Sequence, residues 1–213
     1  MSSHYVKDLS GAWQTIIMFA LLGLVLALII SFVQPLRYSS TARLLILQSS
    51  SDPIDAYTAS RSEERIAENL AALIYTSSFY EQVINSGFTI DQSIFPEQDY
   101  KRRKAWNKTV DAVVARGSGF LTIRAYHHQV DQAEQIVRAI AHILTQNVNQ
   151  FTSGSNVSVR LVDAPLNSRF PVKPNILANI ASGFFLGGFV GMGYIMVQSE
   201  RIRRRHQFIH EEV

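Results

Sequence analysis

Residues 163–199 read DAPLNSRFPVKPN and then ILANIASGFFLGGFVGMGYIMVQS, and this stretch decides the fold. Prolines in its first part fix φ and remove backbone donors, so we expect an extended, stiff strap that is neither a helix nor an inner strand. No Asp, Glu, Lys or Arg occurs from Asn175 to Ser199. About 25 residues at a rise of ~1.5 Å give ~37 Å, enough to cross a ~30 Å hydrocarbon core. The stretch therefore predicts a membrane span at residues 175–199, entered from a strap made by Pro165, Arg169, Pro171, Lys173, Pro174 and Asn175.

A second apolar block lies near the N-terminus. The uncharged run 16–33 is longer than the core of a secretory signal, and no A-x-A cleavage site follows it. Trp13 stands at its start as an interfacial anchor, and Pro35 closes it. We therefore predict a retained transmembrane helix at residues 12–34, preceded by a cytoplasmic segment at residues 1–11.

Two spans place both termini on the same side of a membrane. Positive residues close to the spans favour the cytoplasmic side. The flanks of the first span argue weakly in the other direction, whereas the second span is followed directly by a cluster of arginines. We expect a plasma (inner) membrane protein with a cytoplasmic basic tail at residues 200–213 and an extracytoplasmic domain at residues 35–174. The alternative is a domain in the cytosol.

The domain between the spans has the pattern of an α+β fold. Its expected elements, in order, are a strand at 38–48, a helix begun by the capping-box pair Ser60 and Glu63, a short helix at 79–86 begun by the pair Ser78 and Glu81, a charged helix at 100–109, a hairpin of 110–115 and 120–126, a helix at 130–151, and a strand from Val157 to Leu161. The order β-α-(α)-β-β-α-β predicts a ferredoxin-like domain, an antiparallel sheet with helices on one face.

Glycines in the second span form one candidate packing surface. Gly183, Gly187 and Gly191 recur at intervals of four residues. Small residues at this spacing allow helix backbones to approach closely, so we predict packing against the first span or against a neighbouring subunit. The alternative is the general frequency of glycine in membrane helices.

Basic residues gather in two places. The densest run within the domain, a candidate contact for an anionic glycan or a lipid pyrophosphate, consists of Lys101, Arg102, Arg103, Lys104 and Lys108. The alternative is a solvated helix face, partly neutralised by Asp99 and Asp111. In the tail, the arginines are expected to act as a topology signal and as an anchor for lipid headgroups. The same segment is a candidate contact for a cytoplasmic partner, through Arg203, Arg204, Arg205 and Phe208.

Several classes of chemistry find no support in the sequence. The absence of cysteine excludes disulfides, thiolate metal sites and cysteine nucleophiles. His127 and His128 are adjacent, so on a strand they point to opposite faces, and we expect surface histidines rather than ligands of one metal. No HExxH motif or phosphate-binding glycine loop occurs, and a net charge of +3 is too small to indicate nucleic acid. We therefore expect no catalytic residues, no cofactor, no metal site and no nucleic-acid partner.

Four segments together resemble one family: YSSTARLLIL, AENLAALIYTSSFYEQVINSG, LTIRAYHHQVDQAEQIVRAIA and VSVRLVDAPLNSRFPVKPN. With a span at each end, they resemble the polysaccharide copolymerases, or chain-length determinants of the Wzz type. The resemblance implies a non-enzymatic homo-oligomer in contact with membrane lipid, a polysaccharide polymerase and the growing polymer. It would regulate the chain length, assembly and export of a surface polysaccharide, whether capsule, exopolysaccharide or an O-antigen-like polymer.

The chain departs from larger members of that family. It lacks the long membrane-distal helices and a fused tyrosine-kinase domain, and it resembles the small capsule-type members that work with a separate cytoplasmic tyrosine kinase. Two alternatives stay open beside chain-length control. One is a membrane adaptor that activates such a kinase, and the other is a two-span extracytoplasmic sensor.

Overall fold

The computed structural model describes residues 12–48, 56–152 and 157–210. The chain forms two compact units: a helical unit that contains the described residues up to Pro35 and from Lys173 onward, and a sheet-containing unit, Leu36–Val172. The predicted spans lie in the first unit.

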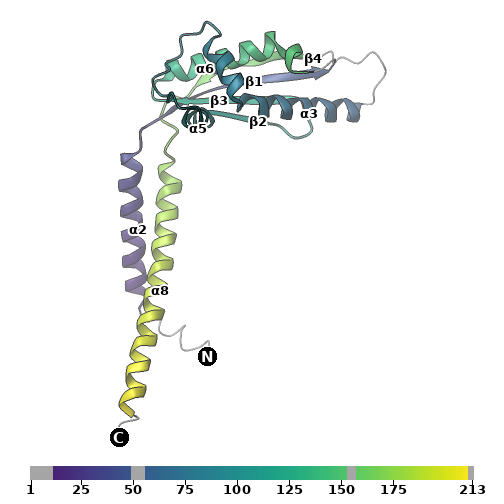
Figure 1. The fold of residues 1–213 in the computed structure, drawn as a ribbon. Coiled ribbons are helices and arrows are strands. Elements are labelled where there is room, and N and C mark those ends of the chain that lie inside the picture. Colours follow the sequence, from purple (N-terminus) through teal and green to yellow (C-terminus); the bar gives the residue numbers. More distant parts are fainter. Residues whose placement is uncertain (1–11, 49–55, 153–156, 211–213) are drawn as a thin grey trace. The chain divides into compact units, whose positions relative to one another are not determined.

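The helical unit consists of α2 (Trp13–Val33) and α8 (Ile176–His210), which lie side by side (Figure 1). The segments Trp13–Val33 and Ile176–Arg201 are both long and apolar enough to cross a membrane. Asn175 caps the second helix, because its Oδ1 atom accepts a hydrogen bond of 3.1 Å from the Ala178 N–H. Helix α8 continues through His210 without a break, so the expected tail starts as helix.

The sheet of the second unit has the strand order β2-β3-β1-β4, and every neighbouring pair is antiparallel. Its strands are β1 (Tyr38–Gln48), β2 (Val110–Val114), β3 (Phe120–His127) and β4 (Val157–Asn167). The unit is therefore mixed α/β with a four-stranded antiparallel sheet, as expected. The narrower ferredoxin-like assignment stays a prediction.

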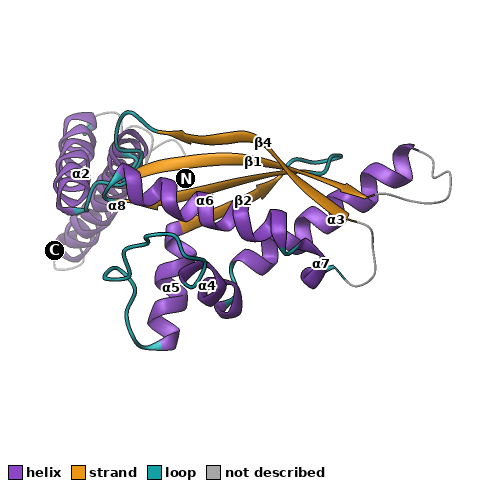
Figure 2. Cartoon of the chain, turned by 90° about the horizontal axis from the view of Figure 1, so that it is seen from above, coloured by secondary structure: helices purple, strands orange, loops and turns teal. Residues whose placement is uncertain are grey.

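Helices cover one face of this sheet (Figure 2). They are α3 (Ala56–Ile74), α4 (Ser77–Ile84), α5 (Asp99–Thr109), α6 (Val130–Gln146) and the short α7 (Val148–Phe151). Alternation along β1 turns Ala42, Leu44 and Ile46 into the core. They pack there against the apolar stripe of α6, including Ile136 and Ile140, in one continuous cluster.

Trp106 fixes the position of α5 in this core. Its side chain is buried, and its indole Nε1–H donates a hydrogen bond of 2.7 Å to the carbonyl oxygen of Ile74. The Trp106 ring also packs edge-on against Tyr80, at 5.3 Å between centroids, and lies 5.9 Å from Phe95. One face of α5 is thereby held against the core, and its basic face is left outside.

Strand β4 forms one edge of the sheet and is longer than expected. It extends past Leu161 to Asn167, and its pairing with β1 shifts register on both sides of Arg43. Pro165 lies within this edge strand, where its missing N–H costs no inner ladder bond. The first part of the strap is therefore a strand, although not an inner one.

The predicted starts of α3 and α4 are wrong. α3 begins at Ala56, ahead of Ser60, whose hydroxyl donates to the Gly117 carbonyl oxygen at 2.7 Å instead of capping the helix. Glu63 accepts from the Gln48 N–H at 3.3 Å. For α4, the cap is the Thr76 hydroxyl, which accepts from the Phe79 N–H at 3.3 Å, in place of the expected Ser78.

The predicted helix at 130–151 is also divided. α6 ends at Gln146, and α7 begins at Val148. Asn147 lies between them with φ −111°, and its N–H still bonds to the Ile143 carbonyl oxygen at 2.8 Å. Val148, which follows the interruption, is still buried in the core.

Candidate functional sites: a basic pocket and a glycine contact

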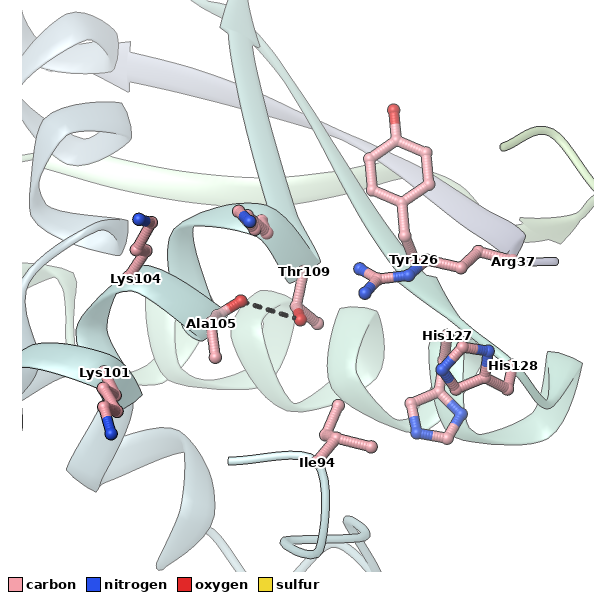
Figure 3. A pocket seen from close by; sticks show the side chains of 10 residues that line it. Arg37, Ile94, Lys101, Lys104, Ala105, Thr109, Tyr126, His127 and His128 are labelled. Atoms are coloured by element: carbon pink, nitrogen blue, oxygen red, sulfur yellow. Dashed lines mark hydrogen bonds between the residues drawn. The ribbon is translucent and has the colours of Figure 1, made fainter. Parts of the chain in front are cut away.

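A pocket of about 220 Å³ opens between α5 and the end of β3 (Figure 3). Lysines of α5 lie on one side of it, and Arg37, Tyr126 and the two histidines lie on the other, with Ile94 between them. Its cationic lining residues are Arg37, Lys101, Lys104 and Lys108, with His127 and His128 beside them. No carboxylate occurs among the described residues that line it.

The α5 lysines share a face because of their spacing. Lys101, Lys104 and Lys108 are separated by three and four positions, so they follow one side of the helix. At the end of this face, the Thr109 hydroxyl donates a hydrogen bond of 3.0 Å to the Ala105 carbonyl oxygen. Because this donor is already used within α5, the lysine ammonium groups are the main polar groups of this wall.

The opposite wall comes from the pairing of β1 with β3. Tyr38 is the register partner of His127, so Arg37 and His128 come to the same end of the sheet. His128 lies with Nδ1 2.9 Å from the Leu36 carbonyl oxygen. Because a carbonyl only accepts, His128 carries a proton on Nδ1 in this arrangement.

His127 is buried, so the expectation of two surface histidines is wrong for this residue. Its Nδ1 accepts a hydrogen bond of 3.1 Å from the Gln129 N–H, which places the proton of the neutral ring on Nε2. That Nε2 atom is buried and has no acceptor among the residues that the structure describes. Burial, and next the neighbouring His128, lower the pKa of His127.

The predicted basic run divides over several environments. Arg102 pairs with Asp99 and lies with its guanidinium 5.7 Å from the centre of the Tyr80 ring. Arg103 lines a second hollow, which it shares with Tyr100, Lys104 and Lys108. Asp99 thereby neutralises part of the run, whereas the Asp111 carboxylate on β2 lies 3.8 Å from Arg124 on β3.

The glycines of α8 lie against α2. A methyl group at Gly183 would come 2.6 Å from the Gly23 carbonyl oxygen, and one at Gly187 would come 3.0 Å from the Ala20 Cα atom. At Gly191 the nearest atom would be the Phe19 Cβ, also at 3.0 Å. These distances are too short for an added side chain, so the two backbones depend on glycine to approach as they do.

A polar contact supplements this glycine face. The Asn179 side-chain amide donates to the Ser31 hydroxyl at 2.8 Å, and Ser31 is fully enclosed within the helical unit. Hydrogen bonds of this kind hold apolar helices together where little water competes. Neither residue stands out in the sequence, because each is a single polar side chain in an apolar run.

The strap residues lie in both units. Arg169 and Pro171 follow β4, and the chain on either side of them is tied to the start of β1 by the Ser168 N–H on Ser39 and the Val172 N–H on Arg37, both at 2.8 Å. Lys173, Pro174 and Asn175 belong to the helical unit.

The predicted partner contact in the tail cannot be placed in the same way. Arg203, Arg204, Arg205 and Phe208 lie in the backbone of α8, but their side chains are outside the described part of the structure.

One family model matches the sequence of the chain. Residues 3–94 match the model described as "Wzz: Chain length determinant protein". The matched segment runs through α2, β1, α3 and α4 and ends in the loop before α5. A comparison with curated proteins gives no match. This match confirms the resemblance stated from the sequence over residues 3–94.

Proposed function

We propose, from the premise that residues 3–94 belong to the Wzz family of chain length determinant proteins, that this chain regulates the length of a surface polysaccharide. The family match is the observation that carries the proposal. Support comes from the two helices that are long and apolar enough to cross a membrane, one near each end of the described chain.

In this proposal the protein catalyses no reaction and acts through the geometry of its assembly. Several copies assemble in the plasma (inner) membrane beside a polymerase and the growing polymer, with both termini in the cytoplasm and residues 35–174 outside. The polymer is a capsule, an exopolysaccharide or an O-antigen-like chain. The strand order β2-β3-β1-β4 supports a ferredoxin-like domain, in which a strand is inserted between the two strands of a split βαβ unit.

The length distribution of the surface polysaccharide tests this function. We expect deletion of the protein to abolish a defined modal length or to remove high-mass polymer on a gel, and we expect the full chain to restore the profile. The Gly193→Ala variant, whose added methyl group would meet no atom within 4 Å, should restore the length profile as well. An unchanged profile after deletion, in cells where the protein is otherwise expressed, contradicts the proposal.

A second candidate function is an adaptor for a separate cytoplasmic tyrosine kinase. The continuation of α8 beyond the apolar segment, from Arg201 to His210, supports it by offering a helix to a partner. Deletion of residues 202–213 should then reduce phosphorylation while the rest of the chain stays in the membrane. Unchanged phosphorylation and polymer output would remove this candidate.

A further inference from the structure

The basic pocket between α5 and the end of β3 has the composition of an anion site. We propose that it binds a phosphoryl group with about two negative charges, such as a phosphate monoester or a pyrophosphate. The residues that would hold it are Arg37, Lys101, Lys104, Lys108 and His127. This inference goes beyond chain-length control and does not depend on it.

The charge balance of the pocket favours a strongly anionic ligand. Arg37 and the three α5 lysines bring four permanent cations around about 220 Å³, and none of them forms an ion pair with a carboxylate among the described residues. Like charges held together repel, and an anion between them removes that cost. A carboxylate supplies one charge, whereas a phosphate monoester supplies about 1.5 to 2 and three acceptor oxygens. The phosphoryl group therefore matches the pocket better.

His127 provides an independent indication of a ligand. Its Nε2–H is a buried donor that lacks an acceptor in the described structure, and buried donors are nearly always paired in native proteins. The ring lines the same pocket as the cations. The Nε2 atom is enclosed, so an oxygen of a bound phosphoryl group would satisfy this donor once the His127 ring turns toward the pocket, a change that a diffuse attraction to surface lysines would not require.

Asp91 is the carboxylate that acts electrostatically on His127, and it does not fill the pocket. It is absent from the lining, and its Oδ1 atom accepts a hydrogen bond of 2.9 Å from the Ser93 N–H. That bond lowers the pKa of Asp91, so the group is an anion at neutral pH and cannot donate to the ligand.

The phosphoryl group can come from a lipid headgroup or from a soluble compound. Both present the same oxygens. Arg37 follows the last residue of α2, a candidate membrane span, by four positions in the sequence, so a lipid headgroup is tested separately as the source. The binding test therefore uses inorganic pyrophosphate as the probe and changes the surrounding lipid separately.

The main experiment measures pyrophosphate binding to the purified full chain in neutral detergent by calorimetry. We expect binding that the triple variant Lys101→Gln, Lys104→Gln, Lys108→Gln weakens by at least about tenfold, because charge-assisted hydrogen bonds are lost. The matched control carries the same charge change on exposed arginines elsewhere in the domain: Arg65→Gln, Arg116→Gln and Arg160→Gln. It should bind within about twofold of the unchanged protein.

Two single variants separate a built site from general charge attraction. His127→Leu leaves the cationic wall intact and removes the buried donor, so it should still weaken binding several-fold. Should the His127 variant fail to fold, Arg37→Gln is compared with Arg160→Gln, which removes one charge outside the pocket, and only Arg37→Gln should weaken binding. Equal weakening of binding by the triple variant and by its matched control overturns the proposal, and so does an absence of pyrophosphate binding.

The remaining arms define the ligand class and its source. Glucuronate, a carboxylate of similar size, should bind at least about tenfold more weakly than pyrophosphate, and equal affinity overturns the phosphoryl assignment. In phosphatidylcholine nanodiscs, added phosphatidic acid should reduce pyrophosphate affinity if a lipid headgroup occupies the site. An unchanged affinity supports the same chemistry with a soluble source. None of these readouts depends on polysaccharide length, so this inference and the proposed function can fail separately.

Discussion

His127 is a titratable side chain that is buried within its own domain. Burial, then the neighbouring His128, lower its pKa below the ordinary value of about 6.5. A histidine with a lower pKa in the folded chain binds fewer protons when folded than when unfolded. Its contribution to stability is therefore present above the unfolded-state pKa and is lost as the pH falls from that value through the lower folded-state pKa.

We predict that His127→Gln reduces the acid sensitivity of the fold. The glutamine side-chain oxygen can still accept from the Gln129 N–H but cannot be protonated, so the variant should lose less stability than the unchanged protein between pH 7.5 and 5.5. Thermal unfolding of the full chain in detergent, followed by circular dichroism at several pH values, measures this difference.

The exposed His142 offers a control for this experiment. His142→Gln makes the same substitution at an exposed position on α6 and measures the effect of the substitution itself on unfolding. Parallel pH curves for His127→Gln and the unchanged protein would contradict the argument from burial.

At the scale of elements, α2 and α8 approach each other closely where glycines lie between them. Gly23 of α2 faces Gly183 and Gly187 of α8, and any added methyl group would overlap atoms of the opposite helix. Insertion of extra volume into a tight contact typically costs about 1–3 kcal/mol. Gly193, on the same helix, has open space around it and gives a matched comparison.

We predict that Gly187→Ala separates the two helices while Gly193→Ala does not. Cysteines placed at Ser31 and Asn179 report the contact, since these side chains are hydrogen-bonded and the chain has no native cysteine. Disulfide formation in membranes should be at least about fivefold slower with Gly187→Ala, the factor that corresponds to about 1 kcal/mol. Equal rates for the two glycine variants would show that the contact does not depend on glycine.

The elements that alternation predicts well are those whose pairing keeps one register. β1 occupies the expected residues 38–48, and the hairpin of β2 and β3 turns at Gly117 with φ +68°, as the glycine-containing loop indicates. β4 was predicted too short because its register shifts opposite Arg43 change which side chains point inward. Periodicity likewise misses the break at Asn147, because α7 continues the apolar stripe of α6 into the same core.

At the scale of the whole molecule, the candidate pocket shows what a sequence can and cannot reveal. The spacing of Lys101, Lys104 and Lys108 is visible as a charge run, and these three residues do share a wall. Arg37 and His127 join them only through the pairing of β1 with β3, which is a tertiary event between distant segments. Burial of His127 follows from the same event, so adjacency with His128 alone suggested surface positions.

The orientation of the chain in a membrane gives a further prediction. A cysteine at Ser118, in the exposed turn between β2 and β3, should react with a membrane-impermeant maleimide in intact cells stripped of any outer barrier. A cysteine at Gln207 should react only after permeabilisation. The cysteine-free sequence provides the background for both. The reverse pattern would place the domain in the cytosol and exclude direct contact with extracytoplasmic polymer.

The edge strand β4 has a consequence for how copies of this domain can meet. A regular sheet edge is a template for strands of other chains and a usual starting point for aggregation. Here the proline at position 165 offers no N–H, and two register shifts interrupt the pairing surface, while the opposite edge strand β2 is only 5 residues long. Both edges therefore resist strand addition, so a newly made domain is protected from fibre-like association. Any ordered assembly of copies must rely on side-chain surfaces instead of a shared sheet.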